Sequence, residues 1–210
     1  MKYSVTLIEV ESGLSLFIPD PAILKATYEQ LLAKDPDTSF PFWAKIWASS
    51  KALTDFLKTK SEWIQGKKVL EMGAGIGVPS FSIAHLVNEI IISDYNKDAV
   101  KLLEKNIAYL NLKNTKAMCL DWNNSQVYLP ADIVLLSDIN YAPDQFNALL
   151  LVIKQYLMMG ARIIIATPQR IMGISFIKAI EAYITYADVI TIIEENLQTD
   201  ISILMLSKNE

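Results

Sequence analysis

The chain has 210 residues, of which 52% are hydrophobic and 20% charged, a size and composition typical of one domain with a substantial core. Its net charge is −4, and acidic and basic residues are mixed along the chain, so a nucleic-acid partner is not favoured. A single histidine, His85, and a single cysteine, Cys119, exclude an internal disulfide and disfavour a zinc site or a cysteine–histidine nucleophile.

The sequence predicts a cytoplasmic protein. Its first residues, MKYSVTLIEVESG, contain no continuous apolar segment, so we expect no signal peptide. The longest apolar region, residues 146–166, is interrupted by Lys154 and Arg162, and we expect a helix and a buried strand there and no membrane contact. Cys119 falls in a predicted strand and is expected to be buried and inert, and His85 is expected to pack on or beside the core.

The amino-terminal part predicts a hairpin and two helices. Residues 3–18 are typical of two strands with a turn between them, and a helix is predicted from Pro21 to Leu32. In residues 42–58 apolar side chains recur at helical spacing, which predicts one helix packed on the main body. We therefore divide the chain into an amino-terminal extension, residues 1–40, packed on a main domain, residues 41–210.

From Gly66 onward, strands and helices alternate. The predicted strands are residues 68–72, 89–93, 115–120, 133–137 and 162–166, and the predicted helices are residues 78–87, 97–111, 143–159 and 172–183. Near-continuous apolar strands indicate a parallel sheet buried on both faces. The last two predicted strands, 187–193 and 200–207, have too short a connection for anything but an antiparallel pair. The expected fold is α/β: a Rossmann-like seven-stranded sheet, mostly parallel, with a C-terminal antiparallel β-hairpin and helices on both faces.

The segment VLEMGAGIGVPS is the strongest functional signal. An acid, Glu71, lies in a strand that runs into Gly73, Gly75 and Gly77 and then into a helix. Glycines allow φ > 0 and close approach to backbone N–H groups, and a helix N-terminus offers further donors. This arrangement at the end of a parallel strand predicts a site for a nucleotide-type ligand. The charge of Glu71 favours a cationic amine over a pyrophosphate.

Acidic residues also follow the next two strands. Asp94 lies about 20 residues after the glycines, where an acid typically accepts hydrogen bonds from ribose hydroxyls. The alternative is that Asp94 caps the next helix, but Asn96 can serve as that cap. Asp121 can accept the amino group of an adenine while Trp122 forms a wall of its site, or Trp122 can simply cover the end of the sheet.

Polar residues after the fourth strand predict the reacting end of the site. Asp138, Asn140 and Tyr141 offer a carboxylate, an amide carbonyl and a phenol that can hold an amine and orient its lone pair. The alternative is a polar loop leading into the following helix. Trp43 and Trp47, four residues apart, are expected on one helix face, either in the core or closing over a ligand.

Taken together, these residues resemble the class I methyltransferases that use S-adenosylmethionine. Within that superfamily the chain is similar to methyltransferase family 16, the seven-strand protein-lysine methyltransferases, especially the branch that acts on the electron transfer flavoprotein β subunit. Three segments carry the narrower resemblance: residues 41–57 with their tryptophans, SDINY at 137–141 and TPQR at 167–170. Residues 1–40 have no clear counterpart, and Asn140 replaces a residue that is commonly apolar or small in this signature.

The resemblance implies S-adenosylmethionine as the methyl donor, S-adenosylhomocysteine as the product and no metal. Its implied cofactor contacts are Trp47, Glu71, Gly73, Ala74, Gly75, Gly77, Asp94, Tyr95, Asp121, Trp122 and Ser137. Asp138, Asn140 and Tyr141 would meet the acceptor. The expected activity is N-methylation of a protein lysine. The alternative acceptor is a small molecule that offers an amine, a carboxylate or a hydroxyl. No membrane partner is expected, and a nucleic-acid partner is disfavoured. An NAD(P)-dependent oxidoreductase and a non-catalytic binding module are the remaining alternatives.

Overall fold

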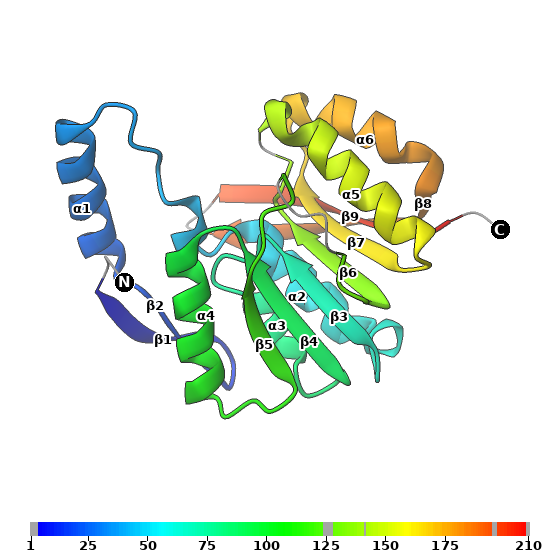
Figure 1. Ribbon diagram of the computed structural model, residues 1–210, viewed down its shortest axis with the longest axis horizontal. Coiled ribbons are helices and arrows are strands. Elements are labelled where there is room, and N and C mark those ends of the chain that lie inside the picture. The colour runs from blue at the N-terminus through cyan, green and yellow to red at the C-terminus, as the bar shows by residue number, and fades with distance from the viewer. Residues whose placement is uncertain (1–3, 124–127, 141, 195–196, 209–210) are drawn as a thin grey trace.

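The computed structural model describes residues 4–123, 128–140, 142–194 and 197–208. Its main sheet has seven strands in the order β5-β4-β3-β6-β7-β9-β8, and a separate two-stranded sheet, β1-β2, precedes it in the chain (Figure 1). Strands β3 to β7 are parallel to one another, whereas β9 runs antiparallel to both β7 and β8. The predicted mostly parallel sheet with a terminal antiparallel hairpin is confirmed.

The elements closely follow the predicted alternation. The strands are β1 (Val5–Glu11), β2 (Leu14–Pro19), β3 (Lys68–Met72), β4 (Glu89–Asp94), β5 (Thr115–Cys119), β6 (Ile133–Ser137), β7 (Arg162–Pro168), β8 (Ile184–Glu194) and β9 (Leu197–Leu206). The α-helices are α1 (Pro21–Lys34), α2 (Ala48–Thr59), α3 (Val78–Ile83), α4 (Lys97–Tyr109), α5 (Phe146–Met158) and α6 (Ile174–Ile180). Short 3-10 turns are η1 (Phe42–Ala44), η2 (Ser61–Trp63), η3 (Pro143–Gln145), η4 (Ile171–Gly173) and η5 (Glu181–Tyr183).

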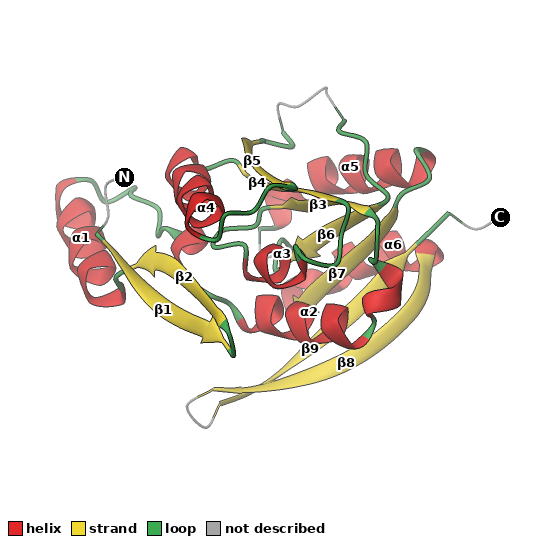
Figure 2. Cartoon of the chain, turned by 90° about the horizontal axis from the view of Figure 1, so that it is seen from below, coloured by secondary structure: helices red, strands yellow, loops and turns green. Residues whose placement is uncertain are grey.

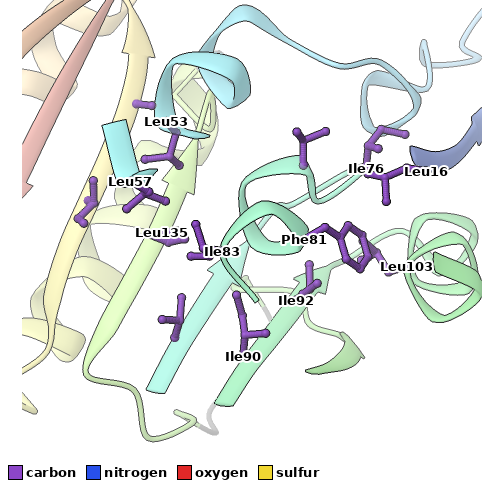
Figure 3. Packing of buried hydrophobic residues seen from close by; sticks show 14 of the residues in the cluster. Leu16, Leu53, Leu57, Ile76, Phe81, Ile83, Ile90, Ile92, Leu103 and Leu135 are labelled. Carbon is purple, nitrogen blue, oxygen red and sulfur yellow. The ribbon is translucent and has the colours of Figure 1, made fainter. Parts of the chain in front are cut away.

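Two hydrophobic cores enclose the sheet, one on each face. Successive residues of a strand point to opposite faces, so Val69 of β3 packs with α2, α3 and α4, whereas Leu70 packs with α5 and α6 (Figure 2). Figure 3 shows the first core, in which Leu57 of α2 and Phe81 of α3 lie above Ile92 of β4. Burial on both faces explains why these strands are almost entirely apolar.

The order of the strands creates a crevice at the centre of the sheet. The chain leaves β3 toward β4 and β5 on one side and returns to pair β6 with β3 on the other. Ligands of open α/β sheets bind outside the carboxyl ends of the strands at such a switch point. The segments that follow β3, β4 and β6 therefore meet there.

The amino-terminal hairpin and α1 lie beyond α4 (Figure 1). The side chain of Asn106 in α4 joins the two parts: its Oδ1 accepts the Phe17 N–H at 2.8 Å, and its Nδ2 donates to the Phe17 carbonyl at 3.0 Å. The Phe17 ring also contacts Tyr109, with the ring centroids 5.2 Å apart. The division of the chain near residue 40 remains a prediction, but these contacts attach the hairpin to α4.

The predicted single helix over residues 42–58 is wrong. It is divided into η1 and α2, because the backbone is extended at Lys45 and at Trp47. The Trp47 indole N–H donates to the Phe42 carbonyl at 3.0 Å, which gives that carbonyl a partner outside the regular helical pattern. Trp43 and Trp47 consequently do not share a helix face.

Smaller differences from the prediction concern the end of one helix and the solvent exposure of two side chains. The helix predicted for residues 78–87 ends at Ile83, which leaves His85 exposed at the surface. Cys119 is also exposed, contrary to its predicted burial, because it is the last residue of β5 at one edge of the sheet. In the described part of the chain, no helix is both long and apolar enough to cross a membrane.

The Asn106 contact can be tested by Asn106→Ala. The substitution leaves the Phe17 N–H and carbonyl without their partner, so we expect a loss of about 1–3 kcal/mol in the free energy of unfolding. Urea denaturation measures this loss, and limited proteolysis within residues 1–34 should become faster. Asn147→Ala, on the exposed side of α5, is the matched control. Equal stability of the two variants would show that Asn106 does not hold the hairpin.

Candidate active site

The centre of the candidate site is a glycine turn bound to the end of β4. Gly73, Gly75 and Gly77 all have positive φ, at 66°, 55° and 77°. Asp94 accepts the Gly75 N–H at 2.9 Å with one carboxylate oxygen and the Asn96 N–H at 2.8 Å with the other. The buried carboxylate therefore holds the turn against β4.

Asn96, and not Asp94, caps α4. Its side chain accepts the N–H groups of Asp98 and Ala99, which confirms the predicted cap. Asp94 is only 3% exposed, and burial raises its pKa against the opposing effect of the Asn96 and Gly75 N–H groups. The carboxylate thus lies at the crevice, where the predicted ribose contact requires it.

Steric limits explain the glycine at position 75. A Cβ there would come within 2.7 Å of the Trp43 carbonyl oxygen, closer than any side chain tolerates, and the backbone is already left-handed. Trp43 is 8% exposed and belongs to the core. The first of the two tryptophans thus packs against the glycine turn, and it also lines the cavity beside that turn.

Glu71 lies in the protein interior, 1% exposed, beneath the glycine turn. One carboxylate oxygen accepts both the N–H and the hydroxyl of Ser80, at the start of α3, and the N–H contact measures 3.2 Å. The other oxygen, Oε1, is buried and has no hydrogen-bond partner among the described residues. Burial raises the pKa of Glu71 from 4.5 to about 7, with a small contribution from the Asp94 charge. In this geometry Glu71 supports α3 and does not line the cavity.

A cavity lies at the switch point, directly outside the glycine turn. Its lining includes these residues that the sequence predicted for the cofactor: Trp47, Gly73, Ala74, Gly75, Gly77, Asp94, Tyr95, Trp122 and Ser137. Asp138 and Ile139 line it from the end of β6, and Lys45 lies at its rim with its ammonium 4.6 Å from the Trp47 ring centroid. Glu71 and Asp121 do not line it; Asp121 instead accepts the N–H of Asn123 at 2.9 Å.

The cavity has a volume of about 70 Å³, whereas small-molecule pockets usually measure about 300–1,000 Å³. The Trp122 indole lies across the glycine turn, so that a Cβ on Gly73 would meet its Cζ3 at 3.3 Å. A ligand as large as a nucleoside therefore requires side chains at the rim to move, and Trp122 is placed to do so.

Two buried polar atoms of the cavity wall fit such a ligand. The Trp122 indole N–H and the Ser137 hydroxyl are both buried and have no hydrogen-bond partner in the described part of the chain. Buried polar groups in native structures nearly always have a partner. Together with the Asp94 carboxylate, they offer donors and an acceptor of the kind that a nucleoside with a polar amino-acid end requires.

Asp138 lines the cavity from the end of β6 in a left-handed backbone conformation. Its φ is +53°, a left-handed conformation that non-glycine residues rarely adopt and that is common at functional sites. Both oxygens of its carboxylate accept hydrogen bonds from the guanidinium of Arg170, which follows β7; the second contact measures 3.1 Å. Only 8% of the Asp138 side chain is exposed. The arginine therefore holds the carboxylate in one orientation at the end of β6.

Of the other two predicted catalytic residues, Asn140 does not line this cavity. Asn140 is 2% exposed and accepts the Thr167 hydroxyl at 2.6 Å, which turns its amide toward β7 and not toward the cavity. Tyr141 lies outside the described residues. Arg170 and Ser80 were assigned no role from the sequence; the TPQR segment was the only available signal for Arg170.

The comparison with known protein families decides where this chain belongs. A family model described as lysine methyltransferase matches residues 32–183, which include every described residue of the site. The chain belongs to the lysine methyltransferase family. No group of three or more histidine, cysteine, aspartate or glutamate residues that could hold a metal ion occurs among the residues the structure describes.

Individual members of the family and related enzymes are similar over part of their length. The calmodulin-lysine N-methyltransferase of Arabidopsis thaliana is 32% identical over 120 residues, covering 53% of this chain and 40% of the relative. The protein N-terminal and lysine N-methyltransferase EFM7 of Yarrowia lipolytica is 29% identical over 161 residues, covering 62% and 59%. The human histone-arginine methyltransferase METTL23 is 28% identical, covering 50% and 58%. The chain thus spans about half the length of the curated relatives it matches.

Solved structures confirm the fold. Trm5b of Pyrococcus abyssi superposes with a TM-score of 0.60 at 17% identity, covering 98% of this chain and 56% of that one. The N-methyltransferase NodS of Bradyrhizobium japonicum also gives 0.60, at 10% identity, covering 75% and 96%. At such low identity these matches support the Rossmann-like methyltransferase fold of the family and nothing about the acceptor.

The pKa of Glu71 predicts a pH-dependent stability. The folded chain binds this proton more tightly than the unfolded chain, so the stabilisation is complete below about pH 4.5 and is lost as the pH rises through about 7. We expect a decrease of up to about 3 kcal/mol in the free energy of unfolding across this window. Burial also raises the pKa of Asp94, so its contribution to stability changes with pH in the same direction.

Glu71→Gln should flatten this dependence, because an amide does not titrate. Urea denaturation from pH 5 to pH 8 measures it, with the exposed Glu62→Gln as the control. If wild type and Glu71→Gln show the same slope, Glu71 is already ionised in the folded protein at pH 5.

Proposed function

We propose that the protein is an S-adenosylmethionine-dependent methyltransferase that N-methylates a lysine side chain of another protein. Membership of the lysine methyltransferase family supports the reaction, and relatives named for lysine methylation of calmodulin and of other proteins support a protein acceptor. The observation that carries the proposal is the buried Asp94 carboxylate on the Gly75 N–H, at the mouth of the switch-point cavity. When bound, the cofactor supplies a methyl group already activated on a sulfonium.

We assign a distinct part of the cavity to each end of the cofactor. We propose the glycine turn for the methionine portion, once Trp122 moves aside, and the Asp94 carboxylate for the ribose hydroxyls. Ser137 offers its unpartnered hydroxyl from β6, and Trp47 and Trp122 offer apolar ring surfaces at the rim. The proposed contacts of Glu71 and Asp121 are indirect, because neither lines the cavity.

Asp138 is the residue we assign to the acceptor. Methyl transfer requires the amine lone pair to lie in line with the carbon–sulfur bond, and positioning alone can contribute about 7–11 kcal/mol. The carboxylate accepts hydrogen bonds from the incoming nitrogen and is kept in orientation by Arg170. The amine must arrive without its extra proton, which burial at the cavity mouth favours by lowering its pKa. The new carbon–nitrogen bond forms as the carbon–sulfur bond breaks.

A guanidinium acceptor is the second candidate, because a relative at 28% identity is named for histone-arginine methylation. A small-molecule amine is the third. Mass spectrometry of a methylated acceptor distinguishes the three directly. Cytoplasmic location and independence of metal remain predictions from the sequence.

Ligand binding tests the cofactor assignment. S-adenosylmethionine and S-adenosylhomocysteine, each at a hundred times its Kd, should stabilise the protein by about 2.7 kcal/mol, and NAD should not. Differential scanning fluorimetry and calorimetric titration measure this. Stabilisation by NAD alone would favour an oxidoreductase, and no response to either adenosyl compound would refute the proposal.

Substitutions at Asp94 and Asp138 distinguish the proposed cofactor end of the site from the proposed acceptor end. In Asp94→Asn, one of the two backbone N–H groups faces an amide NH₂ group, so affinity for S-adenosylhomocysteine should fall at least about tenfold. Asp138→Asn should retain that affinity and lose methyl transfer. Calorimetric titration gives the affinities, with the exposed Asp55→Asn as the control. Similar loss of binding in both variants would place Asp138 with the cofactor and not with the acceptor.

A further inference from the structure

A second and larger cavity, of about 410 Å³, lies beside the acceptor side of the first. It is formed by the segments that follow β6 and β7, by α6 and by β9. Its wall includes Asn140, Arg170, Ile171, Ile174, Ile177 and Leu204. Apolar side chains make up most of this surface, and its volume accommodates one or two amino-acid side chains.

The two cavities are neighbours across a short piece of chain. Asp138 lines the first and Asn140 lines the second, and two residue steps span at most about 7 Å. Arg170, in the wall of the second cavity, pairs with Asp138. An extended peptide whose amine reaches Asp138 therefore passes the second cavity within about two to four residues.

The mouth of the second cavity carries apolar side chains exposed to solvent. Ile171 is 89% exposed and Ile174 is 52% exposed. Folding does not require them at this place, because α6 packs on the core through Phe176 and Ile180, both 1% exposed. Exposed apolar side chains around a cavity are typical of a binding site.

The charges of the wall are positive. Arg170 and Lys178 are its charged residues, and no carboxylate lines it in the described part of the chain. Arg170 is paired with Asp138, whereas Lys178 is exposed and has no ion-pair partner among the described residues. The second cavity thus combines an apolar interior with a free cation at its edge.

We infer that the second cavity binds the segment of the acceptor protein that flanks the methylated residue. It takes an apolar side chain two to four residues from the target nitrogen and an acidic side chain against Lys178. This inference rests on the proposed function, since it places the flanking segment by the position of the acceptor amine. A second copy of the chain fits less well, because a stable dimer buries about 1,200 Å² or more and two exposed isoleucines form a small patch.

Short peptides with one central lysine and tritiated S-adenosylmethionine test the inference. One set carries leucine and glutamate at the flanking positions, a second has serine in place of leucine, and a third has glutamine in place of glutamate. We expect the leucine–glutamate set to be methylated with a kcat/KM at least about tenfold higher than either other set. Ile171→Glu should raise KM for the first set about tenfold while kcat and affinity for S-adenosylhomocysteine are retained.

Leu151→Glu is the matched control, because Leu151 is 66% exposed on α5 and does not line the cavity. If the wild-type protein does not bind S-adenosylhomocysteine, the proposed function itself is wrong. If that binding is intact, the inference is wrong in any of three cases: the peptide sets react equally or not at all, Ile171→Glu behaves like Leu151→Glu, or light scattering shows a wild-type dimer that Ile171→Glu dissociates.

Discussion

The rest of the site depends on one buried carboxylate. Asp94 accepts hydrogen bonds from Gly75 and Asn96 together, and so holds the glycine turn of one strand against the end of the next. The backbone of the turn is left-handed at each of its three glycines, a conformation that glycine adopts readily and other residues rarely adopt. Without that carboxylate, the glycine turn would lose its hydrogen-bonded anchor to the end of β4, and the cavity would lose part of its wall. The same group is the one that we propose as the acceptor for ribose hydroxyls.

The two sides of the cavity use charge differently. At the glycine turn, Asp94 lines the cavity and Glu71 lies beneath the turn. Both are buried carboxylates whose pKa values are raised by burial, and they accept hydrogen bonds from backbone and hydroxyl donors. On the acceptor side, Asp138 is held by a guanidinium, so its orientation is set by an ion pair between β6 and β7. This division suits a reaction in which the donor is bound tightly and the acceptor must be aligned. The second cavity extends the acceptor side along the same strand ends.

Much of this was predictable from local pattern. Near-continuous apolar runs predict strands that are buried on both faces, and the glycine segment after β3 predicts a ligand site before any contact is known. The cap at Asn96 follows from its position before α4. The broken helix was not predictable, because the apolar spacing continues through Trp47 while a hydrogen bond from its own indole to Phe42 interrupts the helix. Nor was the surface position of Cys119, which depends on β5 being an edge strand.

The sequence by itself determined the succession of strands and helices, the glycine turn and the acids that follow the strands, since these are set by residues adjacent in the chain. Only the tertiary structure decided which acids share a cavity. Glu71 faces α3 and Asp121 binds its own loop, whereas Asp94 and Asp138 reach the crevice. The partnership of Asp138 with Arg170, and the cavity beside it, likewise arise from pairing between β6 and β7. Residues 32 positions apart meet only through that pairing, and no local pattern encodes it.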